Sequence, residues 1–240
     1  MPGSIRLHLS LPLHAGAELP VSPGQAHYLA NVMRCAVGET LRLFNGTDGE
    51  WEARITALKR DRVLLQAERQ TRAQAPEPDL WLLFAPLKRD ATDLVVEKAT
   101  ELGASAILPV MTERTNTSRV NPVRLSAIAT EAAEQCERLT VPRIDPPRSL
   151  HDVLADWPDD RQLVVAMERA SAPLVQPAHG PAALLVGPEG GFTDAELDAL
   201  HRHRLVVGAS LGPRILRAET AVIVGLALLQ APLLQAADGG

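Results

Sequence analysis

Apolar positions in the first third of the chain come in short runs that are typical of β-strands. Residues 41–44 form one run and lead into Asn45-Gly46, a dipeptide that favours hairpin turns, and residues 51–55 alternate apolar and polar positions beyond it. A third run covers residues 63–65, and residues 24–34 are typical of a helix. This part of the sequence predicts a small β-barrel domain with one helix.

The pattern changes after a polar stretch with two prolines, residues 71–78, which is typical of a linker. Apolar strand runs then alternate with segments of helical spacing, which predicts an α/β domain on a largely parallel sheet. The predicted strands are 80–84, 107–110, 163–166, 183–186 and 205–207; the predicted helices are 91–102, stopped by Gly103, a segment after Ser126 closing near Pro142, and 218–229. We therefore divide the chain into residues 1–73 and 74–240, and expect the nearly all-apolar last helix to be buried.

Composition is that of a folded chain, with 46% hydrophobic and 22% charged residues. The longest apolar stretch, which begins at Ala221, falls short of the roughly 20 residues that a membrane span needs. The N-terminus lacks a secretory pattern, so we expect a cytoplasmic protein without membrane association. Two distant cysteines and scattered histidines argue against a disulfide framework and against a metal site.

Charge is unevenly distributed along the chain. Residues 1–75 hold 9 Lys and Arg against 7 Asp and Glu, whereas the remainder holds 15 against 22. Ordinary solvated surface accounts for so mild a basic excess at the front. The distribution permits a polyanionic partner without requiring one.

Two loops of the second region carry candidate chemistry, because open α/β sheets bind ligands beyond the carboxyl ends of their strands. The first, Gly187-Pro188-Glu189-Gly190-Gly191, follows a predicted strand. Thr193 and Glu196 then have the spacing of a capping box that starts a helix. Glycines let the backbone approach a ligand closely, although a tight turn would need them equally. The loop matches neither of the common phosphate-binding glycine patterns.

The second loop, residues 211–220, places two arginines, an acid and a hydroxyl at the start of the apolar last helix. Polar groups next to such a helix cost free energy unless they are paired or used. A salt-bridged cap, with Glu219 in the first helical turn, is the structural alternative. Because a glycine-rich loop belongs to the same region, we favour a binding site over a structural cap for these polar residues.

These two loops also form motifs in a fixed order, Val186-Gly187-Pro188-Glu189-Gly190-Gly191-Phe192 and residues 211–221 (LGPRILRAETA). With residues 98–103 (KATELG), Glu113-Arg114 and residues 131–138 (EAAEQCER), they resemble the signature of the RsmE family. Its members are SPOUT-superfamily methyltransferases that modify N3 of a uridine in small-subunit (16S) ribosomal RNA. The resemblance covers both regions, since the front one is similar to a PUA-like RNA-binding barrel through His27 and Val32-Met33-Arg34.

The resemblance implies an α/β fold in which a SPOUT-type, trefoil-knotted parallel-sheet domain follows a small PUA-like β-barrel domain. It also implies a homodimer and S-adenosyl-L-methionine as cofactor. The implied cofactor-binding residues are Ala166, Met167, Glu168, Val186, Gly187, Pro188, Glu189, Gly190, Gly191, Leu211, Gly212, Ile215, Leu216, Arg217 and Thr220.

Methyl transfer to uridine N3 requires that donor and acceptor be aligned and that the N3 proton be removed. We assign Arg217 to stabilise charge on the uracil, and Glu219 to accept the proton or to orient that arginine; a base from the RNA or from water is the alternative. The implied RNA-binding residues are His27, Arg34, Lys88, Arg89, Arg114 and Arg138. The sequence departs from the family at Ala218, where many relatives have Thr, and at Lys88-Arg89-Asp90, where Lys-Gly is more usual.

Two other functions are possible for a chain with these motifs. A non-catalytic RNA-binding assembly factor should have decayed cofactor loops, whereas both loops are intact here. A methyltransferase of the same superfamily acting on a ribose 2′-hydroxyl is disfavoured by the PUA-like front region and by the motif at residues 211–220. The expected partner is ribosomal RNA, free or within the small ribosomal subunit.

Overall fold

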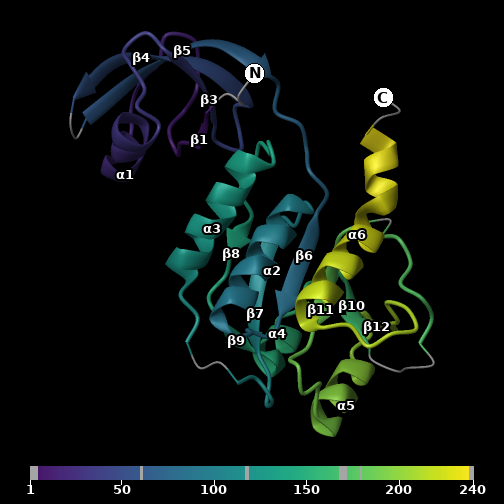
Figure 1. Ribbon diagram of the computed structural model, residues 1–240. Coiled ribbons are helices and arrows are strands. Elements are labelled where there is room, and N and C mark those ends of the chain that lie inside the picture. Colours follow the sequence, from purple (N-terminus) through teal and green to yellow (C-terminus); the bar gives the residue numbers. More distant parts are fainter. Residues whose placement is uncertain (1–4, 60–61, 117–118, 168–171, 179, 238–240) are drawn as a thin grey trace. The chain divides into compact units, whose positions relative to one another are not determined.

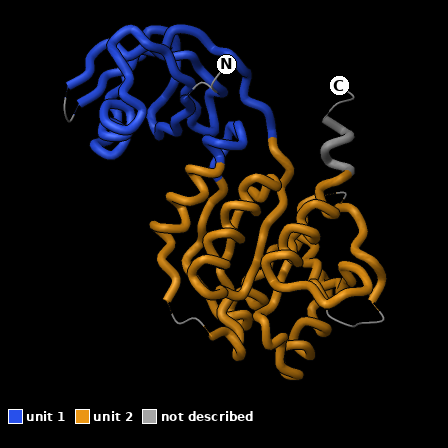
Figure 2. Tube along the Cα trace, viewed as in Figure 1, with its two compact units in different colours: residues 1–76, 133–141 blue, residues 77–132, 142–240 orange. Residues whose placement is uncertain are grey.

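The computed structural model describes residues 5–59, 62–116, 119–167, 172–178 and 180–237, with side chains up to residue 231. The chain divides into two compact units (Figure 2). Unit 1 comprises residues 1–76 and 133–141, and unit 2 comprises residues 77–132 and 142–240. The domain boundary between residues 73 and 74 stays a prediction.

Unit 1 is built on a five-stranded sheet with the order β1-β3-β4-β5-β2 (Figure 1). Its strands are β1 (Arg6–His8), β2 (Glu18–Pro20), β3 (Thr40–Phe44), β4 (Glu50–Lys59) and β5 (Arg62–Arg72). A capping box of Ser22 and Gln25 starts helix α1 (Pro23–His27), which continues into a π-helical turn over Tyr28–Val32. The predicted strands and helix of the front region are confirmed, with β5 much longer than the predicted run.

The predicted hairpin between β3 and β4 forms with a connection over residues 45–49, because Phe44 pairs with Glu50. The side-chain oxygen of Asn45 accepts the N–H groups of Thr47 (3.0 Å) and Asp48 (2.8 Å). This Asx turn makes the connection longer than the two residues that Asn-Gly most often spans.

Arg6 on β1 is buried and binds residues 133–138 of unit 1 to the sheet. Its Nε donates to Glu50 Oε2 at 2.9 Å, and its guanidinium lies 4.5 Å from the centre of the Phe44 ring. Its Nη atoms donate to three backbone carbonyls, those of Ala133 (2.9 Å), Glu134 (3.1 Å) and Arg138 (2.8 Å). Because buried polar groups need partners, this network holds a segment from the middle of the chain against the first strand.

Unit 2 contains a parallel sheet with the order β12-β10-β11-β6-β7-β8, and β9 also pairs with β7 (Figure 1). Its strands are β6 (Leu80–Phe84), β7 (Ala106–Met111), β8 (Arg143–Ile144), β9 (Arg148–Ser149), β10 (Gln162–Ala166), β11 (Ala182–Val186) and β12 (Val206–Ala209). The pairings recorded between these strands are parallel, which confirms the predicted sheet. The loops that follow the strands therefore share one edge.

Helices cover both faces of this sheet. They are α2 (Arg89–Glu101), α3 (Pro122–Gln135), whose last three residues belong to unit 1, α4 (Leu150–Ala155), α5 (Asp194–Arg202) and α6 (Ala218–Ala237). α2 and α6 contact each other in front of the sheet in Figure 1, and α4 and α5 contact each other and pack on the opposite face. Ala183 and Leu185 of β11 pack with α4 and α5, whereas Leu184 between them contacts α6. The central strands β6, β7 and β11 are apolar throughout because both faces of the sheet are covered there.

The ends of two helices test the predicted boundaries. α2 stops before Gly103, whose φ of 78° gives the predicted C-terminal stop. α3 begins at Pro122, four residues before Ser126, because proline suits the first helical position and the side-chain oxygen of Asn121 accepts the Arg124 N–H (3.2 Å). The predicted start was therefore wrong.

α6 begins at Ala218 as predicted but continues to Ala237. Val222, Leu226 and Leu229 are buried, and Gly225 lies so close to β11 that a Cβ there would be 2.6 Å from Leu184 Cδ2. Thr220, Ala227 and Leu228 are exposed, so the prediction of a fully buried helix was wrong for this side. Neither α6 nor another helix in the described part of the chain is long and apolar enough to cross a membrane.

Candidate active site

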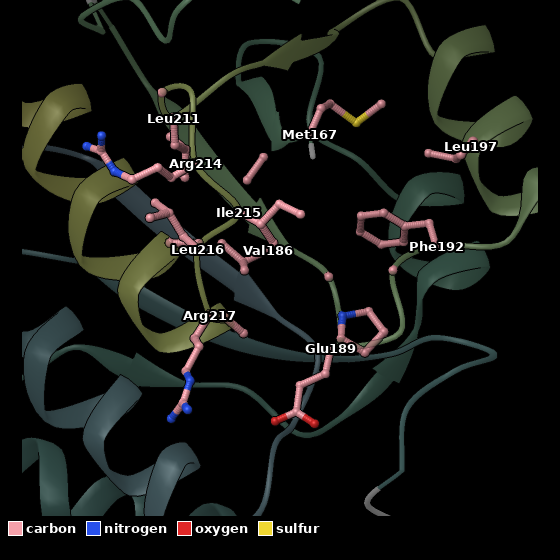
Figure 3. A pocket seen from close by; sticks show the side chains of 17 residues that line it. Met167, Val186, Glu189, Phe192, Leu197, Leu211, Arg214, Ile215, Leu216 and Arg217 are labelled. Atoms are coloured by element: carbon pink, nitrogen blue, oxygen red, sulfur yellow. The ribbon is translucent and has the colours of Figure 1, made fainter. Parts of the chain in front are cut away.

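Three loops at the carboxyl edge of the parallel sheet enclose a pocket of about 450 Å³, here called the loop pocket (Figure 3). The loops follow β10, β11 and β12. The lining residues are Ala166, Met167, Val186, Gly187, Pro188, Glu189, Gly191, Phe192, Leu197, Leu211, Gly212, Arg214, Ile215, Leu216, Arg217, Ala218 and Ala221. The lining is mainly apolar, with charge contributed by Glu189, Arg214 and Arg217, as is typical of small-molecule sites.

Close packing shapes the glycine loop after β11. Gly187 lies against the ring of Phe192, where a Cβ would be only 2.8 Å from Cε2. Gly191 has a φ of 68° and donates its N–H to the Pro188 carbonyl at 2.8 Å. The predicted capping box of Thr193 and Glu196 is confirmed and starts α5 directly after the loop. The glycines therefore allow a tight turn and also leave space for a ligand in the pocket.

The loop after β7 braces the glycine loop. Arg114 Nη1 donates to the backbone carbonyls of Gly190 (2.8 Å) and Phe192 (3.3 Å). The neighbouring Glu113 N–H donates to Glu196 Oε1 at 2.9 Å. The pattern of the sequence carries no sign of these contacts, because they join segments more than 70 residues apart. Arg114 thus has a positioning contact beside its predicted role in RNA binding.

Arg217 lies where the loop after β12 enters α6, and its backbone carbonyl accepts the Ala221 N–H at 2.8 Å. Figure 3 shows the side chains of Arg217 and Glu189 extending from different loops toward the same side of the pocket. Glu219 lies in the first turn of α6 and does not line the loop pocket. Among the described residues the structure records no ion pair between Arg217 and Glu219. The structural alternative, a helix cap held by a salt bridge between these two residues, is therefore not supported.

The structure gathers most of the predicted cofactor residues. Those that line the pocket are Ala166, Met167, Val186, Gly187, Pro188, Glu189, Gly191, Leu211, Gly212, Ile215, Leu216 and Arg217. Gly190 and Thr220 do not line it, and Glu168 falls outside the described residues. Phe192, Leu197, Arg214, Ala218 and Ala221 also line the pocket, although they were not among the predicted cofactor residues. Phe192 and Ala218 could have been predicted, because each is next in sequence to a predicted cofactor residue or motif.

The predicted RNA-binding residues are distributed over both units. His27, Arg34 and Arg138 belong to unit 1, and Lys88, Arg89 and Arg114 belong to unit 2. Arg34 has an unusual φ of 55°, and Arg138 donates to Thr140 Oγ1 at 3.0 Å. Their roles in RNA binding stay predictions. Within the described ranges, no three His, Cys, Asp or Glu side chains gather as metal ligands would.

Both regions of the chain match families of known proteins. Residues 74–230 match a family model described as an RNA methyltransferase domain, and residues 21–68 match an RNA methyltransferase PUA domain. Ribosomal RNA small subunit methyltransferase E of Rickettsia conorii is 34% identical over 232 residues, which is 92% of this chain and 93% of that protein.

Two solved structures of S-adenosylmethionine-bound proteins are similar to this chain over nearly its whole length. A Legionella pneumophila protein solved with S-adenosylmethionine has a TM-score of 0.87 and 29% identity, covering 96% of this chain and 98% of that one. Ribosomal RNA small subunit methyltransferase E of Neisseria gonorrhoeae, also solved with S-adenosylmethionine, has a TM-score of 0.87 and 28% identity at the same coverage. The sequence motifs, the parallel sheet with its loop pocket and these relatives together show that the chain belongs to the ribosomal RNA small subunit methyltransferase E family.

Proposed function

We propose that this protein transfers a methyl group from S-adenosyl-L-methionine to N3 of a uridine in small-subunit ribosomal RNA. The observation that carries the proposal is the loop pocket, in which the glycine loop and the Arg217 loop meet at the carboxyl edge of the sheet. A parallel sheet binds its ligands at this edge. The trefoil knot that the family resemblance implies is part of the proposal.

The residues present fit S-adenosylmethionine. The pocket volume of about 450 Å³ lies within the range of about 300–1,000 Å³ that small-molecule sites have. Val186, Ile215 and Leu216 offer apolar surface for an adenine ring, and the backbone of the glycine loop offers hydrogen-bonding groups at close range. Glu189 places a negative charge at the pocket, which suits a positively charged ligand.

The bound cofactor supplies an electrophilic methyl group, and the chain must prepare the acceptor nitrogen. Uridine N3 carries a proton at neutral pH, so a group has to accept it while charge spreads onto the two flanking carbonyl oxygens. Arg217 stabilises that charge from the edge of the pocket. Glu219 is the predicted proton acceptor or orienting partner, and Glu189 is the carboxylate that lines the pocket together with Arg217.

The substitution Gly187→Val tests the cofactor site. Its side chain would have to displace the Phe192 ring, which lines the pocket, at a cost typical of overpacking, about 1–3 kcal/mol. We expect the Kd for S-adenosylmethionine, measured by calorimetry, to rise about 10-fold. Gly180→Val is the matched control, because a Cβ at Gly180 meets nothing within 4 Å. Equal affinity in the two variants would contradict this view of the loop.

We also propose that the protein is a homodimer in the cytoplasm, with the exposed side of α6 at the interface. Leu228 lies on that side with 41% of its surface exposed, an apolar area that a second copy would cover. Leu228→Glu should shift the protein from dimer to monomer in light scattering. Val207→Glu, at a 40% exposed residue of β12, is the control that should stay dimeric. A wild-type protein that is monomeric at all concentrations would contradict the proposal.

The reaction itself is tested in cells. Nucleoside mass spectrometry of ribosomal RNA from a deletion strain should show loss of N3-methyluridine, and the returned gene should restore it. Loss of a ribose-methylated nucleoside instead would favour the 2′-hydroxyl alternative. An RNA unchanged by the deletion would favour the non-catalytic assembly factor.

A further inference from the structure

A second pocket of unit 2, about 340 Å³ in volume, opens between the first turns of α2 and α3; we call it the arginine pocket. Its lining residues are Pro86, Leu87, Arg89, Thr92, Arg119, Val120, Asn121, Arg124 and Leu125. Pro86 and Leu87 follow β6, and the segment before α3 follows β7, so the pocket lies at the same carboxyl edge as the loop pocket. It is nonetheless lined by a separate set of residues.

The side chains of the arginine pocket carry excess positive charge. Arg89, Arg119 and Arg124 line it, Lys88 adjoins it, and the acids nearby are Asp90 and Asp93, which leaves a surplus of two. Arg124 is held in place by a two-bond pair with Asp93. In the described part of the chain, no carboxylate is recorded as a partner of Arg89 or Arg119. Their guanidinium groups are therefore available to an anion.

Backbone groups add to this charge. α2 is 13 residues long, and its N-cap Lys88 makes no side-chain hydrogen bond to the first turn of the helix. By contrast, Asn121 caps the first turn of α3 through the Arg124 N–H (3.2 Å). The first turn of α2 thus has no side-chain cap from Lys88, and its residues Arg89 and Thr92 line the pocket. A helix start of this kind, joined to arginine side chains, has the chemistry of a phosphate site.

We infer that the arginine pocket binds a backbone phosphate of the substrate RNA, next to the nucleotide that enters the loop pocket. This inference rests on the proposed function. β6 and β11, the strands that lead to the two pockets, are direct neighbours, and the Ala85 N–H donates to the Val186 carbonyl at 3.0 Å where they end. An RNA strand lying along this edge can therefore present a base to one pocket and a phosphate to the other. A phosphate contact fixes register without reading sequence.

The test uses the full-length protein, a small-subunit ribosomal RNA transcript and a series of potassium chloride concentrations. Arg89→Gln and Arg119→Gln should each lower the slope of log affinity against log salt by about 0.7–0.9, the value of one lost phosphate contact. When the salt concentration is lowered from 1 M to 0.1 M, the affinity of each variant should therefore rise about fivefold to eightfold less than the affinity of the wild type. Arg204→Gln is the matched control, since Arg204 is exposed and precedes β12, at the opposite edge of the sheet.

The outcomes separate this inference from the function on which it rests. A reduced slope in both variants, with wild-type affinity for S-adenosylmethionine as proof of folding, supports a phosphate contact in the arginine pocket. Slopes equal to that of Arg204→Gln, in a protein that still methylates the transcript, overturn the inference and leave the function standing. A wild-type protein that neither binds nor methylates the transcript contradicts the proposed function itself.

Discussion

Replacing Arg217 with alanine is expected to lower the single-turnover rate of methyl transfer by about 10²–10³, which corresponds to about 2.7–4 kcal/mol. Arg217 lines the loop pocket, and Figure 3 shows its side chain on the same side of the pocket as that of Glu189. If the guanidinium stabilises charge that develops on the uracil, its interaction strengthens in the transition state. Affinity for cofactor and RNA should then change far less than the rate.

The measurement is a single-turnover assay on folded protein saturated with cofactor and RNA. Arg214→Ala is the matched control, because Arg214 lines the same pocket from the same loop and should retain most of the rate. A rate for Arg217→Ala within about threefold of wild type would remove Arg217 from the chemistry, against the expected magnitude. Glu189→Gln and Glu219→Gln, assayed beside it, would show which carboxylate takes the proton.

Arg6→Ala is expected to lower the free energy of unfolding of unit 1 by about 3–5 kcal/mol, because it removes the buried partner of Glu50. Glu50 then keeps only the Thr71 hydroxyl at 2.9 Å and the half-exposed Arg72 at 3.9 Å. The side chains of Arg6 and Glu50 are only 6% and 9% exposed. The variant also removes the donors to the carbonyls of residues 133, 134 and 138. Residues 133–141 should loosen together with β1.

Native-state hydrogen exchange checks this expectation, since it reports each unit separately. Amides of β3 and β4 should lose protection in Arg6→Ala, whereas those of β10 and β11 should keep it. Arg69→Ala is the control, because Arg69 pairs with Glu52 while its side chain is 65% exposed, and such surface pairs contribute about 1 kcal/mol or less. Equal protection in the two variants would show that the Arg6 network is dispensable.

Local pattern was sufficient for the longer strands and for the loops that follow them, whereas the short strands β1, β2, β8 and β9 were not predicted. Residues 80–84 were predicted as a strand and form β6, and the spacing of Thr193 and Glu196 located the start of α5. Both features depend on neighbours within a few residues. The glycine loop was placed correctly for the same reason, because its position after a buried strand is visible in the sequence.

Contacts between segments far apart in the sequence determine the features that the hydrophobic pattern could not predict. The bracing of Gly190 by Arg114 and the capture of residues 133–138 by Arg6 join segments far apart in the chain, so no periodicity indicates them. The start of α3 at Pro122 depended on a local cap, Asn121, that could have been recognised. The exposed side of α6 has an apolar composition like that of the buried side, so composition alone could not distinguish them.

The most direct test of the account is transfer of a labelled methyl group from S-adenosylmethionine to small-subunit ribosomal RNA by the purified protein. The RNA is then digested to nucleosides and analysed by mass spectrometry. We expect label in N3-methyluridine for the wild type and nearly none for Arg217→Ala. Label on a ribose 2′-oxygen, or an RNA without label beside a protein that binds the cofactor, would contradict the proposed reaction.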